Sequence, residues 1–225
     1  MSTARDEILR RIRGALSDVP AGESAGEVRV AREYRRRGCS DRADVLELLS
    51  ERLVDYHADV RRVPAAAVGA SVGEACRRLG LLRVAVPEAL PAQWRPDGVE
   101  LIEDRGLTAR ELDALDGAIT GCAAAIAQTG TLVLDGEGTC GRRILTLVPD
   151  HHICVVRASQ VVELVPEAIA ALATAVTERR APVTLISGPS ATSDIELSRV
   201  EGVHGPRHLL VLIVADSGGA QGPGA

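Results

Sequence analysis

The chain has 225 residues, of which 46% are hydrophobic and 25% charged, and its formal net charge at pH 7 is −5. This length suits one large α/β domain, or one domain with an N-terminal appendage. The chain contains arginine but no lysine, which excludes P-loop NTPases and enzymes that form a Schiff base through a lysine. Its net negative charge and its total of three aromatic residues make it a poor candidate for binding nucleic acid.

The N-terminal segment differs from the rest of the chain. Residues 3–16 place Ile8, Ile12 and Leu16 on one stripe, which predicts a short amphipathic helix that docks against another surface. Residues 17–40 are rich in Gly, Pro, Glu and Arg without apolar periodicity, which indicates an extended arm. We therefore expect an N-terminal helix and arm over residues 1–40.

The main domain is expected over residues 41–215, followed by a Gly-rich, disordered tail at 216–225. Its apolar patterns predict helices over 41–54, 64–79, 108–115 and 166–179, the last with Ile169, Leu172 and Val176 facing inward. Strands are predicted near 58–63, 82–86, 99–103, 131–135, 144–148, 152–156, 183–187 and 209–214. Strands that alternate with helices predict an α/β fold with a mainly parallel sheet flanked by helices, and ligands at the carboxyl ends of the strands.

The five cysteines lie far apart and include no CxxC pair, which is typical of reduced thiols in a cytoplasmic protein. The spacing also argues against an iron–sulfur cluster on this chain. No apolar stretch is long enough to span a membrane. His151 and His152 have only Asp150 and Cys154 near them in the sequence, so we predict no metal site and no bound cofactor.

The glycines at 136, 138 and 141 match the G-x-G-x-x-G spacing of a dinucleotide-binding loop. The next residues, from Arg142 to Val148, have the alternating pattern of a strand, whereas a dinucleotide loop must open a helix. A hairpin between two strands is the better interpretation. Arg142 and Arg143 either contact an anion or are solvated residues at a strand end.

The stretch LISGPSATSDIE, residues 185–196, combines two patterns. Ser193 and Glu196 have the spacing of a helix capping box, with Asp194 in the first turn. Ser187, Gly188, Pro189 and Ser190 precede it as a small-residue turn, whose backbone N–H groups are expected to be free to bind an anion. The two interpretations are compatible.

Two further segments are candidates for the same site. His204 lies in a glycine-flanked turn and is either a general acid–base or a structural loop residue. Thr129, Gly130 and Thr131 end a run of small residues, which predicts either a tightly packed helix or a second loop facing the crevice at Ser187–Ser190.

Four motifs in this order resemble the lactate-utilisation protein C family, the LUD-domain proteins: AIAQTGTLVL (125–134), TLVPDHHICVV (146–156), SGPSATSDIE (187–196) and GVHGP (202–206). The resemblance implies a fold similar to the sugar-phosphate isomerase and CoA-transferase-like (NagB/RpiA/CoA transferase-like) group. It also implies a role in oxidising L-lactate to pyruvate with partner subunits that carry the iron–sulfur clusters. Relatives often have Glu where this chain has Gln128, so a mechanism that needs an acid at this position is in doubt.

These arguments assign the candidate site. The catalytic candidates are His204, Asp194 and Glu196, and the ligand-binding candidates are Thr129, Gly130, Thr131, Ser187, Gly188, Pro189, Ser190 and Gly205. The expected ligand is a small anion, and the expected role is that of a subunit of a cytoplasmic L-lactate system. The alternatives are an independent enzyme or binding protein for a sugar phosphate or acyl-CoA, and a regulatory module that docks through its N-terminal helix.

Overall fold

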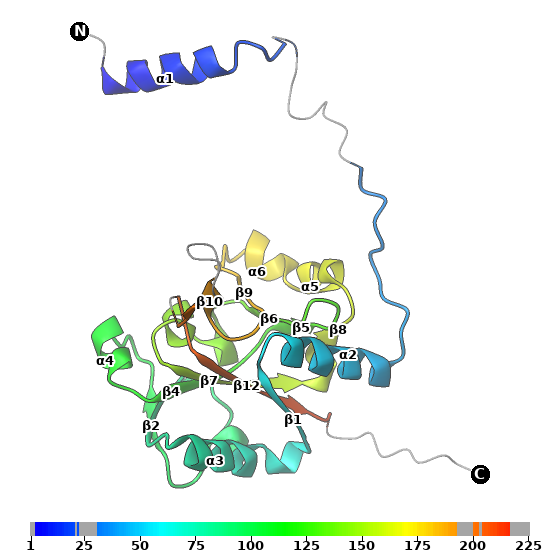
Figure 1. Ribbon diagram of the computed structural model, residues 1–225, viewed down its shortest axis with the longest axis vertical. Helices are drawn as coiled ribbons and strands as arrows, with labels where there is room; N and C mark the ends of the chain where they lie inside the picture. Colours follow the sequence, from blue (N-terminus) through cyan, green and yellow to red (C-terminus); the bar gives the residue numbers. More distant parts are fainter. Residues whose placement is uncertain (1–2, 21, 23–30, 193–199, 203, 217–225) are drawn as a thin grey trace. The chain divides into compact units, whose positions relative to one another are not determined.

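The fold was obtained as a computed structural model, which describes residues 3–20, 22, 31–192, 200–202 and 204–216 (Figure 1). The chain divides into two compact units, Met1–Tyr34 and Arg35–Ala225. In the part of the chain that the structure describes, every helix is too short or too polar to cross a bilayer.

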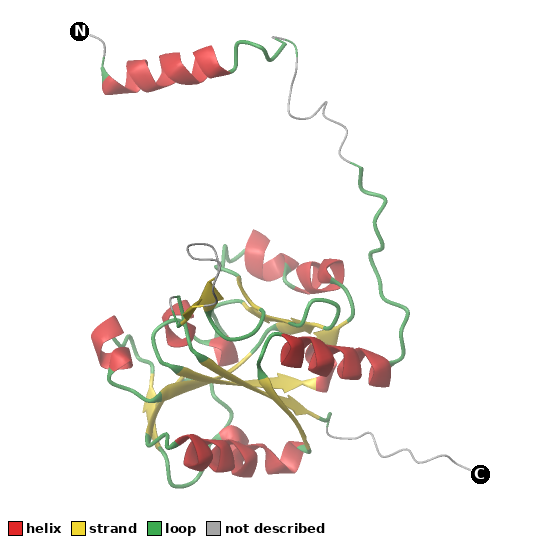
Figure 2. Cartoon of the chain, in the orientation of Figure 1, coloured by secondary structure: helices red, strands yellow, loops and turns green. Residues whose placement is uncertain are grey.

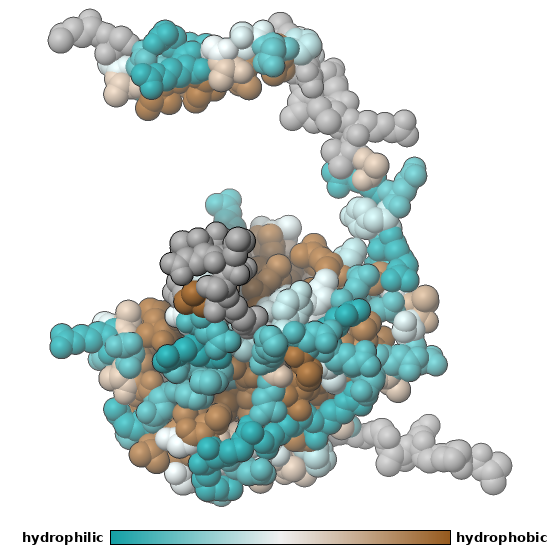
Figure 3. Space-filling view, viewed as in Figure 1, coloured by the Kyte–Doolittle hydropathy of each residue, from teal (hydrophilic) through white to brown (hydrophobic). Residues whose placement is uncertain are grey.

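The N-terminal unit contains helix α1 (Ala4–Ala15), which begins with a capping box between Thr3 and Asp6. The side chain of Thr3 accepts a hydrogen bond from the backbone N–H of Asp6, and the carboxylate of Asp6 accepts one from the N–H of Thr3. Ile8, Ile12 and Leu16 are exposed and give the helix one apolar side (Figure 3). The predicted amphipathic helix is therefore present.

The larger unit is built on a six-stranded sheet in which every neighbouring pair is parallel. The strand order is β1-β12-β7-β4-β2-β3. The bounds are β1 (Asp59–Val63), β2 (Arg83–Val86), β3 (Glu100–Glu103), β4 (Gly117–Gly121), β7 (His151–Arg157) and β12 (His208–Val214). The predicted α/β fold with a mainly parallel sheet flanked by helices is confirmed.

A smaller four-stranded sheet has the order β8-β5-β6-β9 and contains both parallel and antiparallel pairs. A two-stranded ladder, β10 with β11, follows it in the chain. The bounds are β5 (Ala124–Ile126), β6 (Thr131–Leu134), β8 (Val161–Val162), β9 (Thr184–Ile186), β10 (Ala191–Thr192) and β11 (Val200–Glu201). The run of small residues before Thr131 thus forms strand β5, so the predicted packed helix there is wrong.

The helices and the smaller sheet form layers on the two faces of the six-stranded sheet (Figures 1 and 2). Helix α3 covers one face of the six-stranded sheet, and α2 lies on the other face with the smaller sheet, against which α5 packs. The bounds are α2 (Arg42–Asp55), α3 (Val68–Leu79), α4 (Ala109–Asp113), α5 (Val165–Ala171) and α6 (Ala173–Thr177).

Strands β7 and β12 are buried on both faces, because their side chains alternate between two hydrophobic cores. Cys154 and Val211 belong to the core shared with α2, whereas Ile153 and Leu210 belong to the core under α3. A strand covered on both faces needs a continuous apolar run. The sequences ICVV and LLVLIV meet this requirement, which explains why both strands were predictable.

The strand predicted near residues 144–148 is absent, so the predicted hairpin is wrong. Arg143–Thr146 forms a 3-10 turn instead, and a second turn covers Gly138–Cys140. The turn brings Leu145 into a buried cluster with residues of β2, α4 and β4, and the hydroxyl of Thr146 donates to the carbonyl of Arg143. Tertiary packing therefore overrides the alternating pattern of this segment.

The helix predicted over 166–179 is divided at Leu172 into α5 and α6. Its buried face consists of Ala168, Leu172 and Ala175, whereas Ile169 and Val176 are exposed. The predicted inward face is therefore wrong except at Leu172. Small alanine side chains permit close packing on the smaller sheet, which places the larger residues outside.

Candidate functional site

The segments that carry the sequence motifs surround a surface cavity of about 300 Å³. It lies over the amino ends of β7 and β12, because His152 and Leu209, the second residues of these strands, are part of its wall. Its described walls are Arg143, Thr146, Leu147, His152, Thr184–Ala191, His204–Pro206 and Leu209. This position differs from the expectation of a site at the carboxyl ends, where another hollow of about 440 Å³ lies beside Cys122 and Arg157.

His152 contributes a buried imidazole to the cavity wall. Its Nε2 lies 2.8 Å from the hydroxyl of Thr120, which is also fully buried. Burial lowers the pKa of His152 to about 4, so this ring is neutral at pH 7. Sequence reasoning considered His152 only as a metal ligand and missed both this pairing and Thr146, for which the sequence offers no signal.

The Ser187–Ser190 turn is fixed by hydrogen bonds and by close packing. The hydroxyl of Ser187 lies 2.8 Å from that of Thr131. Gly188 has a φ of +87°, and an added Cβ would lie 2.6 Å from the carbonyl oxygen of Tyr56, so only glycine fits there. The N–H of Ser190 donates to the carbonyl of Pro206 over 2.8 Å. The expectation that all backbone N–H groups of this turn are free is therefore wrong for Ser190.

His204 and Gly205 lie next to Ser190 of this turn. The N–H of His204 donates to the hydroxyl of Ser190 over 3.1 Å, and a Cβ on Gly205 would approach the side chain of Ser190. The imidazole of His204 is exposed and belongs to the cavity wall. The structure thus brings Ser187, Ser190 and His204 together, as the sequence motifs suggest.

Thr129, Gly130 and Thr131 support this turn from outside the described cavity wall. The hydroxyls of Thr129 and Thr131 lie 2.7 Å apart, and the hydroxyl of Thr131 is also within hydrogen-bond distance of that of Ser187. Gly130 packs against Arg52 of α2. Direct ligand contact by these residues remains a prediction. Gln128 is exposed, and its backbone N–H donates a hydrogen bond to the backbone carbonyl of Glu163 over 3.0 Å.

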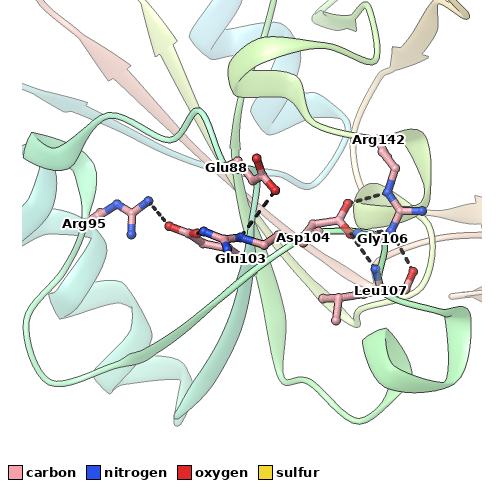
Figure 4. Close-up of polar contacts among 8 residues, drawn as sticks. Glu88, Arg95, Glu103, Asp104, Gly106, Leu107 and Arg142 are labelled. Carbon is pink, nitrogen blue, oxygen red and sulfur yellow. Dashed lines mark hydrogen bonds and ion pairs between the residues drawn. The ribbon is translucent and has the colours of Figure 1, made fainter.

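Arg143 lines the cavity, whereas the adjacent Arg142 does not. Arg142 forms an ion pair with Asp104, its Nε 2.7 Å from a carboxylate oxygen, and also donates to the carbonyl of Leu107 (Figure 4). Burial alone would raise the pKa of Asp104, but the hydrogen bonds from Arg142 and from backbone N–H groups outweigh it and lower the pKa. Arg142 therefore anchors the turn that holds Arg143 at the cavity.

The remaining predicted catalytic residues, Asp194 and Glu196, lie outside the described residues, as does Ser193 of the predicted capping box. The described ends of this segment, β10 and β11, pair antiparallel with Ala191 opposite Glu201. The roles of the two acids stay predictions.

Three of the five free cysteines, Cys122, Cys140 and Cys154, are buried near one another below the hollow at the carboxyl ends. A hydrogen bond with Cys154 and burial raise the pKa of Cys122, and burial raises the pKa of Cys140 to about 12. Cys122 and Cys140 are therefore neutral thiols at pH 7.

The geometry defines an α/β protein in which a parallel sheet and a smaller mixed sheet hold a polar cavity between two glycine-containing turns. The chain belongs to the LUD-domain family, whose model matches residues 35–214.

Similarity to individual proteins agrees with this assignment. The chain is 47% identical over 174 residues to "Lactate utilization protein C" of Deinococcus radiodurans, which covers 77% of this chain and 81% of that protein. It is 25% identical to the protein of the same name from Shouchella clausii, over 84% of this chain and 86% of that one. A crystal structure of a DUF162 family protein from D. radiodurans matches with a TM-score of 0.68 and 38% identity, over 78% of this chain and 99% of that chain.

Proposed function

We propose that this protein is the LUD-domain subunit of a system that oxidises L-lactate to pyruvate, and that its cavity binds a small carboxylate. The partners would be subunits that carry iron–sulfur clusters, as the family resemblance implies. Two observations together support the proposal. The chain is 47% identical to a "Lactate utilization protein C", and the motifs that resemble this family line a cavity that contains an arginine.

The cavity has the groups that recognition of a short hydroxy acid requires. Arg143 is the one arginine among its described wall residues, and a guanidinium binds a carboxylate through two parallel hydrogen bonds. The hydroxyls of Ser187 and Ser190 are further donors, and Leu147 and Ile186 offer apolar surface for a methyl group.

In this proposal His204 accepts the proton of the substrate hydroxyl, because its exposed ring belongs to the cavity wall and an imidazole is the most common general base in enzymes. Oxidation of lactate to pyruvate breaks its O–H and C2–H bonds and releases two electrons and two protons; His204 would take the hydroxyl proton, and one of Asp194 and Glu196 would take the C2 proton. The electrons would leave through the partner subunits, and this chain would bind and orient the substrate. Asp194 and Glu196 are proposed to assist His204.

We also propose a cytoplasmic location. All five cysteines carry free thiols. Free, buried thiols are typical of a reducing compartment.

The binding step can be tested by calorimetry with L-lactate and pyruvate on the purified full chain. Arg143→Gln should weaken binding about 10- to 150-fold, the loss expected for hydrogen bonds to a charged group. Arg110→Gln, which changes an exposed arginine of α4 away from the cavity, should bind as the wild type does. Equal affinity in the two variants would contradict the assignment of Arg143.

The cellular role requires a genetic test. A strain that lacks this gene and any redundant lactate dehydrogenase should fail to grow on L-lactate, and the wild-type gene should restore growth. Unchanged growth of the deletion strain would refute the proposed role.

The size of the cavity favours one alternative. The cavity volume of about 300 Å³ lies at the lower end of the range for sites that bind drug-sized ligands. It is larger than the volume that a lactate molecule occupies. An independent enzyme or binding protein for a sugar phosphate or acyl-CoA is therefore the second candidate. Tight binding of these compounds without partner subunits, together with no affinity for lactate, would favour it.

A further inference from the structure

A second group of polar side chains meets at the amino ends of β7 and β12, on the face of the sheet that α3 covers. Asp150 immediately precedes β7, His151 is its first residue, and the parallel register places His208 of β12 directly beside His151. One carboxylate oxygen and one nitrogen from each ring all lie within 4.8 Å of one another. His208 lies far from Asp150 and His151 in the sequence, so no local spacing could reveal this group.

The rings of His151 and His208 are arranged side by side. Their centroids are 4.5 Å apart and their planes differ by 20°. The Nδ1 of His151 lies 3.2 Å from the carbonyl oxygen of Asp116. Because a carbonyl only accepts hydrogen bonds, Nδ1 carries the hydrogen in this contact, which leaves the lone pair on Nε2. A backbone carbonyl fixes the tautomer of many metal-binding histidines in this way.

The third member, Asp150, is paired with Arg207 over 2.6 Å. The side chain of Arg207 is 57% exposed, so it can leave the carboxylate at little cost. Asp113 and Glu201 line a hollow of about 530 Å³ together with Asp150 and Arg207. The hollow that His151 and His208 line contains Asp59, Arg78 and Arg207.

We propose that Asp150, His151 and His208 bind a divalent transition-metal ion of the zinc type, and that the ion competes with Arg207 for the carboxylate of Asp150. Two imidazoles and one carboxylate are a common zinc ligand set, with water in the fourth position. Bonds of about 2.0–2.2 Å require ligand atoms roughly 3.3–3.5 Å apart in a tetrahedral site. The ligand atoms, which lie within 4.8 Å of one another, therefore need to approach by up to about 1.5 Å when the ion binds.

The ion would also fix part of the cavity wall. His208 follows the His204–Pro206 segment, which forms part of that wall, and Asp150 immediately precedes the neighbouring strand β7. A metal bridge between them would hold the end of this turn to β7. The proposal does not depend on lactate as the ligand, because its test measures the metal alone.

The test is calorimetric titration of the metal-stripped full chain with zinc, together with thermal unfolding with and without zinc. The wild type should bind one zinc ion and unfold at a higher temperature in its presence, since a ligand that binds only the folded state stabilises it. His208→Gln and Asp150→Asn should each weaken binding about tenfold or more. Arg207→Gln should bind zinc more tightly, because it removes the competing cation.

The matched control is His204→Gln, which removes another exposed histidine and should leave zinc affinity unchanged. Circular dichroism confirms that each variant is folded, and Asp150→Asn gives an independent measurement if His208→Gln does not fold. Cobalt absorption supplies a third measurement, because a thiolate-to-cobalt charge-transfer band would place the ion on a cysteine and overturn the site. Absence of zinc binding, or equal binding by His208→Gln and His204→Gln, would also overturn it. Unchanged affinity in Arg207→Gln would refute the competition.

Discussion

The buried imidazole of His152 should make folding stability depend on pH between 7.5 and 5. Its pKa is about 4 in the folded chain, whereas an exposed histidine in the unfolded chain has a pKa of 6.5. The unfolded chain therefore binds a proton at pH 5 and the folded chain does not. The contribution is fully present above pH 6.5 and is lost as the pH falls toward 4.

The magnitude follows from the two pKa values. At pH 5 the difference in proton binding destabilises the folded chain by about 2 kcal/mol relative to pH 7.5, and below pH 4 the loss reaches about 3 kcal/mol. His151 adds a loss of the same sign, because burial lowers its pKa as well. The contribution of His152 must therefore be measured as a difference between variants.

Urea unfolding at pH 7.5 and 5.0 provides this difference. His152→Gln should lose about 2 kcal/mol less stability over this range than the wild type, whatever its stability at pH 7.5. Proton NMR of the His152 ring in the wild type is an independent measurement, and its midpoint should lie near 4. Equal losses in His152→Gln and the wild type, or a ring that titrates near 6.5, would refute the reasoning.

Two further predictions concern the framework of the cavity. Gly188→Ala should lower the free energy of unfolding in urea by more than about 3 kcal/mol, because the strain of a φ of +87° adds to the clash with Tyr56. The control is Gly138→Ala, where φ is also positive but the space around the added Cβ is open. It should cost only about 1 kcal/mol in the same assay. Asp104→Asn should cost about 1–3 kcal/mol, because the ion pair with Arg142 is lost. It should also weaken ligand binding in calorimetry, and unchanged binding would contradict the anchoring role.

The sequence predicts those parts of the fold in which one local pattern matches the burial. Strands β7 and β12 are examples, because a short continuous run of β-branched and leucine residues is typical of a strand that is buried on both faces. Residues 144–148 show the opposite case. Their alternation is typical of a strand, but burial of Leu145 and the anchor at Arg142 produce a 3-10 turn. Neither contact has a signal in the local sequence.

The candidate site shows the same division. The turns at Ser187–Ser190 and His204–Gly205 could be identified from their glycines, and the structure places both on one cavity. The partners that hold them could not be identified, because contacts such as Tyr56 with Gly188 and Thr120 with His152 depend on how distant elements pack. The same limit applies to His208, which joins His151 only through the register of the sheet.

The position of the cavity has a consequence for the function. At the amino ends of β7 and β12 a ligand lacks the help of the crossover loops that usually form sites at the carboxyl ends of parallel strands. The wall must come from elsewhere, and here a single chain segment from β9 to β12 supplies most of it. This segment is held by hydroxyl and backbone contacts at Ser187, Ser190 and Pro206 rather than by a large apolar core. Substitutions that weaken these contacts should therefore change ligand affinity before they change global stability, which distinguishes the cavity wall from the sheet beneath it.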